Sequence, residues 1–145
     1  MGKIASLVLT VMVGLLTCGQ RQNNPDIFTL QFLCASPEIY RIDYVASLDG
    51  EYLCTGGVAN FEKVPLNNDP YVFDHFTQEA LEGREEGTLS LELHLYDEKE
   101  DKEIAILDPI DMQARLGAKR VVLISGDKAS GFRAELAAQR PAAGR

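Results

Sequence analysis

The sequence is 145 residues long and lacks the short motifs that mark catalytic, metal-binding or nucleotide-binding proteins. It contains two histidines, His75 and His94, and neither belongs to a Cys/His spacing that would hold zinc. The pair Gly56-Gly57 is not followed by the further glycines and the Lys-Ser or Lys-Thr pair of a phosphate-binding loop. We therefore expect no metal and no cofactor.

Positive charge is also scarce. Lysine and arginine together number 14 whereas aspartate and glutamate number 22, which gives a formal net charge of −8 at pH 7. The basic residues are not gathered into a patch interleaved with aromatic side chains, and an acidic chain repels nucleic acid and anionic lipid head groups. The composition predicts no nucleic-acid partner, and it permits a basic protein partner.

The chain has no hydrophobic run of membrane-spanning length. Its longest uncharged apolar run covers residues 4–16, which is 13 residues, whereas a membrane-spanning helix needs about 20. An apolar segment of this length behind a basic residue, here Lys3, is typical of a secretory signal. We therefore interpret residues 1–17 as a signal segment.

This run ends in Leu15-Leu16-Thr17-Cys18-Gly19, which resembles the lipobox of bacterial lipoproteins. Leu15 stands three residues before the cysteine, and Thr17 stands where the family pattern has Gly, Ala or Ser. The resemblance implies that Cys18 becomes a lipidated N-terminus. It also implies anchoring to a membrane of the cell envelope, facing the periplasm or the cell surface, with the polar residues 18–26 as a tether.

Two other interpretations of the N-terminus remain open. The stretch Met1 to Ser6 also matches the pattern for N-myristoylation. The apolar run could instead be a buried helix or strand, because runs of about 10 to 14 apolar residues occur in protein cores.

The three cysteines bear on the same question of compartment. If Cys18 carries lipid, Cys34 and Cys54 remain as a pair in an oxidising compartment, where we expect a disulfide that encloses residues 35–53. Such a loop would add about 3 kcal/mol of stability in the chain-entropy model. The alternative is two buried free thiols.

The clearest structural pattern is a strict alternation from Thr88 to Tyr96. Every second residue in this stretch is leucine, and the residues between them are polar or aromatic: Thr88, Ser90, Glu92, His94 and Tyr96. Period-two alternation is typical of a strand with one buried and one solvated face. We expect this stretch to be the central strand of an antiparallel β-domain.

Similar patterns predict six further strands. The pair Asp49-Gly50 separates two of them and favours a two-residue hairpin, in which Val45 would oppose Cys54 and Ser47 would oppose Tyr52. The seven predicted strands cover residues 27–34, 40–48, 51–55, 88–96, 104–107, 120–125 and 132–136. This spacing indicates an all-β fold, a small antiparallel β-sandwich over residues 27–137, followed by a flexible tail at 138–145.

One short helix is predicted from Asp74 to Leu81, with Asp74 as its cap and Gly83 as its stop. Residues 111–117 are expected to form a helical turn or an irregular crossover. Strands and helices do not alternate along the chain, so a parallel sheet is not expected.

An acidic stretch is the first candidate for a binding surface. It connects two predicted strands, and its carboxylates are Asp97, Glu98, Glu100, Asp101 and Glu103. It lacks the glycine and the spacing of an EF-hand calcium loop, and its two lysines compete for the same oxygens. We expect a solvated hairpin tip, and a partner with basic residues could contact it.

Three hypotheses of function follow. The preferred one is an exported, lipid-anchored envelope protein that acts by binding another protein, as an adaptor or inhibitor. A second is a small hydrolase in which His94 or His75 works with a nearby carboxylate. A third is a structural subunit of an envelope complex.

Overall fold

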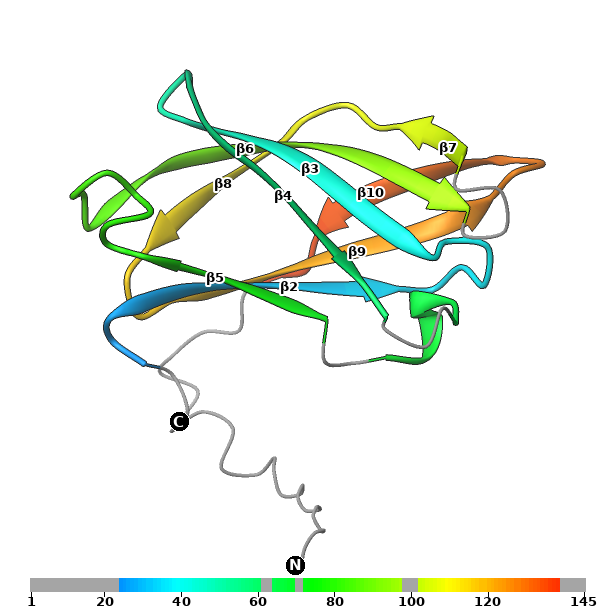
Figure 1. Cartoon of the computed structure of the whole chain (residues 1–145), viewed down its shortest axis with the longest axis horizontal. Helices are drawn as coiled ribbons and strands as arrows, with labels where there is room; N and C mark the ends of the chain where they lie inside the picture. Colours follow the sequence, from blue (N-terminus) through cyan, green and yellow to red (C-terminus); the bar gives the residue numbers. More distant parts are fainter. Residues whose placement is uncertain (1–23, 61–63, 70–71, 98–101, 139–145) are drawn as a thin grey trace, which may run out of the picture.

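The computed structural model describes residues 24–60, 64–69, 72–97 and 102–138. In this part of the chain nine strands stack as two sheets, which confirms the predicted all-β sandwich (Figure 1). The strands are β2 (Ile27–Cys34), β3 (Arg41–Leu48), β4 (Glu51–Ala59), β5 (Phe73–Thr77), β6 (Glu86–Asp97), β7 (Lys102–Ile106), β8 (Ile110–Arg115), β9 (Lys119–Asp127) and β10 (Gly131–Leu136). A single turn of 3-10 helix, η2 (Leu66–Asn68), precedes β5.

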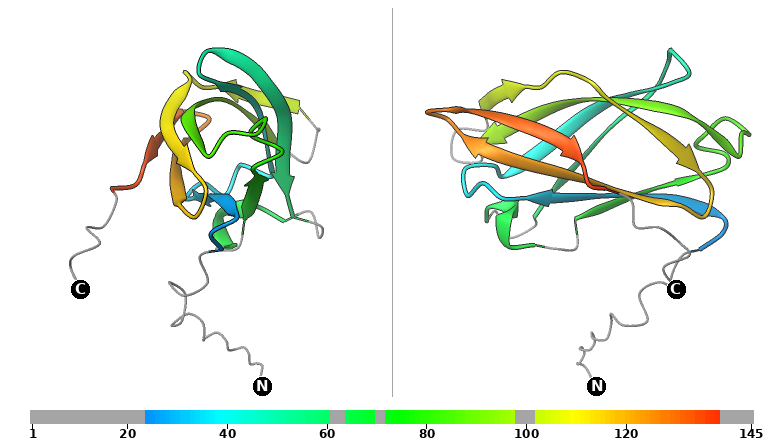
Figure 2. Two further views of the ribbon diagram at one scale, coloured as in Figure 1. Left: turned by 90° about the vertical axis from the view of Figure 1, so that its left-hand side faces the viewer. Right: turned by 180° about the vertical axis from the view of Figure 1, so that it is seen from behind.

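The two sheets form the layers seen end-on in the left view of Figure 2. The four-stranded sheet has the order β10-β9-β2-β5, and the five-stranded sheet has the order β4-β3-β6-β7 with β8 also paired to β6. The long strand β6 pairs with β8 over its first half and with β7 over its second half. The predicted central strand is therefore central in its sheet, since it pairs with three others.

The core lies between the sheets and is built from the alternating faces that the sequence predicted. Leu89, Leu91, Leu93 and Leu95 are all completely buried. Burial of one such side chain contributes roughly 1.5–3 kcal/mol. The aromatic ring of Tyr44 bridges the layers, because its centroid lies 6.2 Å from that of Phe32 and 6.5 Å from that of Phe76.

The predicted helix at Asp74 to Leu81 is wrong. Its first half is strand β5, and residues 78–83 form a turn that leads to β6. The segment forms a strand because it pairs with β2, where Phe76 lies opposite Phe28 and Asp74 lies opposite Leu30. This register directs the side chains of Phe76 and Asp74 toward the core. Asp74 therefore caps no helix, and Gly83, with a φ of +87°, ends the turn.

The expected crossover at residues 111–117 is also corrected, because most of it is strand β8. Met112 and Ala114 are buried, while Asp111, Gln113 and Arg115 are exposed, so the segment has the period of a strand. Its register against β6 pairs Leu89 with Met112. The short alternation was present in the sequence, but its small and flexible side chains gave a weak signal.

One pair of strands is parallel, contrary to expectation. Strand β2 pairs with β9 in parallel, from Thr29 opposite Lys119 to Cys34 opposite Ile124. These strands are far apart in the sequence, so no local turn sets their direction. The remaining strand pairs are antiparallel.

The hairpin at Asp49-Gly50 forms as predicted, but its register shifts within β4. Ser47 opposes Tyr52, as expected, whereas Cys54 opposes Ala46 instead of Val45 because of a bulge between these pairs. A bulge adds one residue to one strand and turns the following side chains to the other face. Cys54 therefore lies on the side of β4 that faces the core.

The predicted signal segment at 1–17 and the lipidation site Cys18 lie outside the described residues, as do most of the tether and of the tail. Within the described residues there is no helix with the length and apolar character needed to cross a membrane.

Candidate functional site

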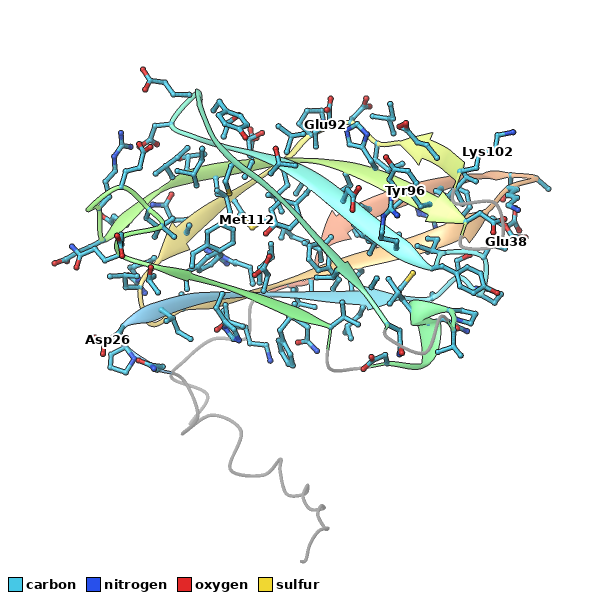
Figure 3. All side chains as sticks on the ribbon, in the orientation of Figure 1. Asp26, Glu38, Glu92, Tyr96, Lys102 and Met112 are labelled. Atoms are coloured by element: carbon cyan, nitrogen blue, oxygen red, sulfur yellow. The ribbon has the colours of Figure 1, made fainter. Side chains whose placement is uncertain are left out.

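The acidic hairpin lies at the end of the sandwich opposite to the point where the chain enters it. Figure 3 places Asp26 at one end of the long axis and Lys102, Tyr96 and Glu38 at the other. The entering strand β2 belongs to the four-stranded sheet, whereas the hairpin strands β6 and β7 belong to the five-stranded sheet. The hairpin is thus displaced from the entry point both along the molecule and across its two layers.

Two of the five predicted tip carboxylates, Asp97 and Glu103, are described. Glu98, Glu100 and Asp101 lie outside the described residues. Asp97 is the last residue of β6, and its carboxylate forms an ion pair of 2.7 Å with the Nζ atom of Lys128. Asp97 is therefore held in place by the turn between β9 and β10.

Lys128 also connects this hairpin to the loop between β2 and β3. Its backbone N–H donates a hydrogen bond of 2.7 Å to the carboxylate of Glu38. A shallow depression of about 320 Å³ is lined by Asp97, Lys102, Glu103, Ile104 and Lys128. We call the five charged residues of this region the hairpin-end cluster: Glu38, Asp97, Lys102, Glu103 and Lys128.

His94 is held by two carboxylates on the outer face of the five-stranded sheet. Its Nε2 atom lies 3.0 Å from Glu92 and its Nδ1 atom 3.1 Å from Glu103 on the neighbouring strand β7. The hydrogen bond with Glu92, supported by Glu103, raises the pKa of His94 in spite of partial burial. This geometry favours the imidazolium form, which joins β6 to β7 beside the hairpin-end cluster.

His75 lies on the other sheet and has a different environment. Its Nδ1 atom is 3.4 Å from the hydroxyl of Thr29, and both residues are on the outer face of the four-stranded sheet. The carboxylate of Asp74 accepts a hydrogen bond from the backbone N–H of His75, so it does not orient the ring. A nucleophile, a base and an orienting acid are not brought together here.

The two histidines therefore sit on opposite sheets: the ring of His94 has the nearby carboxylates that the hydrolase hypothesis named, whereas the described hydrogen bonds of the His75 ring include no carboxylate. Both ring nitrogens of His94 contact carboxylates, and the described hydrogen bonds of His94 include no serine or cysteine. Among the described residues there is also no group of three or more His, Cys, Asp and Glu side chains that could hold a metal ion.

The predicted disulfide between Cys34 and Cys54 is absent, and both residues are free thiols. Cys34 lies on β2 in one sheet and Cys54 on β4, at the edge of the other. Burial raises the pKa of both thiols, and the nearby carboxylate of Asp74 raises that of Cys54 further. These environments suppress the reactive thiolate form.

Sequence patterns missed a polar contact inside the sandwich. The phenol of Tyr44 on β3 donates a hydrogen bond to the carboxylate of Asp74 on β5. Burial, together with this hydrogen bond, raises the pKa of Tyr44, so the phenol keeps its proton. Because the sequence pattern predicted a helix from Asp74 to Leu81, it gave no indication that Asp74 would face Tyr44.

A depression of about 470 Å³ beside the ends of β2 and β9 was also not predicted. Its lining includes Leu33, Cys34 and Leu123 as well as the polar residues Asn67 and Glu135. Leu33 and Leu123 are paired across the parallel strands and are partly exposed. The local sequence gives no sign of this hollow, because its walls meet only when β2, β9 and η2 come together.

No protein-family model matches this chain, and no curated protein is significantly similar to it.

Proposed function

We propose that this chain is an exported, lipid-anchored binding protein of the cell envelope that contacts a basic protein partner through its hairpin end. The observation that carries the proposal is the position of the acidic hairpin, at the opposite end and in the opposite layer from Asp26. A tether attached before Asp26 would leave the hairpin end accessible to a partner.

The charge of the hairpin supports a basic partner. The stretch from Asp97 to Glu103 contains five carboxylates and two lysines, and the whole chain has a net charge of −8. Such a field increases the association rate with a positively charged surface. The ion pair between Asp97 and Lys128 and the bond to Glu38 hold the base of the hairpin in one conformation, which reduces the entropy lost on binding.

The anchor is tested by localisation of the full chain in an expressing bacterium. Wild-type protein is expected in the membrane fraction with acyl mass on Cys18. The variant Cys18→Ser should carry no acyl mass, since its acceptor thiol is lost. Wild-type protein without acyl mass, or a variant that still carries it, would refute lipid anchoring at Cys18.

The binding surface is tested by comparing two variants that each remove three negative charges. The first neutralises the hairpin: Glu98→Gln, Glu100→Gln and Asp101→Asn. The second neutralises the exposed turn between β5 and β6, at the entry end of the sandwich: Glu79→Gln, Glu82→Gln and Glu85→Gln.

Proteins crosslinked to the wild-type chain in intact envelopes would be identified by mass spectrometry. The same proteins would then be quantified with each variant. The amount of a basic partner crosslinked to the hairpin variant should be much lower than the amount crosslinked to wild type. This difference should be smaller at high salt, because screening also weakens the wild-type contact. Equal loss in both variants would indicate a non-specific charge effect, and no loss in either would reject the hairpin as the contact surface.

A further inference from the structure

The edge strand β4 differs from the other edges of the two sheets. It pairs with β3 alone among the described strands, and the left view of Figure 2 shows it at the margin of the five-stranded sheet. It has nine residues, whereas β5 and β7 have five each and β8 and β10 have six each. Long edge strands with unpaired backbone groups readily pair with another chain.

The shorter edge strands all carry charged or ionisable side chains, which discourage such pairing. These residues are Asp74 and His75 on β5, Lys102 and Glu103 on β7, Asp111 and Arg115 on β8, and Arg133 and Glu135 on β10. Strand β4 has one charged residue, Glu51, at its first position, and no proline. Its bulge lies near its beginning, so residues 54–59 are paired regularly with β3.

The middle of β4 carries no bulky side chain of its own. Gly56 and Gly57 lie in the middle of the regular part, and the space beside them is filled by the side chains of Tyr44 and Asp43 on the neighbouring strand β3. Tyr52, which precedes the bulge, is 66% exposed, and its hydroxyl lies 3.0 Å from that of Thr55. The ring of Tyr52 therefore adds exposed apolar surface beside this edge.

From these features we infer that β4 pairs with β4 of a second copy of this chain, antiparallel and about a two-fold axis. The charge distribution selects this occupant. Two copies of a chain with net charge −8 repel each other at most orientations. Residues 52–59 of β4 carry no charge, and the carboxylate of Asp43, which lies over Gly57, is ion-paired with Arg41, so two β4 edges can meet with little repulsion. In an antiparallel pair a residue on the axis faces its own copy, and Gly56 or Gly57 can do so without a clash.

The resulting dimer is compatible with attachment of both copies to one membrane. An axis perpendicular to the joined sheet keeps the same face of both copies on the same side. The two five-stranded sheets would become one continuous sheet, and both four-stranded sheets, into which β2 leads, would lie on its other side. The inference does not depend on the proposed partner at the hairpin end.

The test is the mass of the full chain in a mild, density-matched detergent, measured by sedimentation equilibrium over a range of concentrations. Wild-type protein should show a monomer–dimer equilibrium. The variant Thr55→Lys places a charge in the middle of β4 and should weaken the dimer at least tenfold, about 1.4 kcal/mol. The matched variant Gln113→Lys adds the same charge to the already charged edge β8 and should leave the dimer unchanged.

Hydrogen exchange provides the second measurement. Amides of β4 should exchange more slowly at high than at low protein concentration, whereas those of the edge strand β10 should not respond. Circular dichroism would establish that each variant is folded. A wild-type chain that is monomeric throughout, a Thr55→Lys dimer as tight as wild type, or exchange in β4 that is independent of concentration would overturn the inference.

Discussion

The phenol of Tyr44 donates a hydrogen bond to the carboxylate of Asp74 and thereby joins the two sheets through their shared interior. Tyr44 is 2% exposed, and its ring packs against Phe32 and Phe76. Gly56 on the neighbouring strand β4 provides the space for the phenol. This contact links the three strands β3, β4 and β5 at one side of the sandwich.

Removal of the phenol is expected to destabilise the fold. Tyr44→Phe keeps the ring but leaves the partly buried carboxylate of Asp74 without this donor, which should cost about 1–3 kcal/mol. Urea unfolding of the full chain would measure the loss. Tyr52→Phe is the matched control, because the hydroxyl of Tyr52 is exposed and its removal should change stability by about 0.5 kcal/mol or less.

The glycine beneath the phenol can be tested separately. A Cβ atom at Gly56 would clash with the Tyr44 hydroxyl oxygen and would lie 2.5 Å from the ring carbon that carries it. Gly56→Ala should therefore displace the phenol and lower the unfolding free energy by roughly 1–3 kcal/mol, as overpacking commonly does. An unfolding midpoint equal to that of wild type would show that the phenol is not confined here.

Stability should depend on pH through His94. Its pKa is raised above the ordinary value of 6.5 by Glu92 and Glu103. A group whose pKa is higher in the folded than in the unfolded state contributes its full stabilisation of the fold at pH values below its unfolded pKa. This stabilisation is then lost as pH rises through the folded value.

Urea unfolding between about pH 5.5 and 8.5 measures this dependence. Wild-type stability should fall as the pH rises above 6.5, and His94→Asn should remove that fall. His75→Asn is the control, since His75 contacts the hydroxyl of Thr29 and no carboxylate through its ring. A pH dependence that survives in His94→Asn would assign it to other groups.

The free thiols predict a specific pattern of alkylation. Without reductant, the folded chain should react slowly, because burial raises the pKa of Cys34 and of Cys54 and so lowers the thiolate fraction. Cys54 should react before Cys34, which is the more buried of the two. After unfolding without reductant both thiols should be alkylated, and mass spectrometry would show this. Failure to alkylate them would establish the disulfide that the structure lacks.

Much of the fold could be predicted because several strands carry strong period-two patterns. The leucines of β6, the alternating faces of β2 and β3, and the turn at Asp49-Gly50 each encode a local conformation that needs no distant residue. Strands β5 and β8 were missed for opposite reasons. Asp74 and Gly83 in the region of β5 mimic helix boundaries, whereas β8 has only Met112 and Ala114 as buried residues.

The candidate site was predicted only in part. A run of charge between two strands identifies the acidic hairpin, and alternation places His94 on a solvated face. The contacts of Lys128 with Asp97 and Glu38 join loops that are far apart in the sequence, so no local pattern announces them. The same holds for Glu103, predicted as a binding residue, whose carboxylate contacts His94.

The sequence by itself determined the class of the fold, its principal strands and the acidity of one hairpin, because alternation, turn chemistry and charge are local properties. The tertiary structure decided which strands became neighbours. It made β2 and β9 a parallel pair, kept Cys34 and Cys54 as free thiols and brought Asp74 to Tyr44. These outcomes depend on the packing of two sheets around one core, where the burial of distant residues outweighs the preference of any single segment.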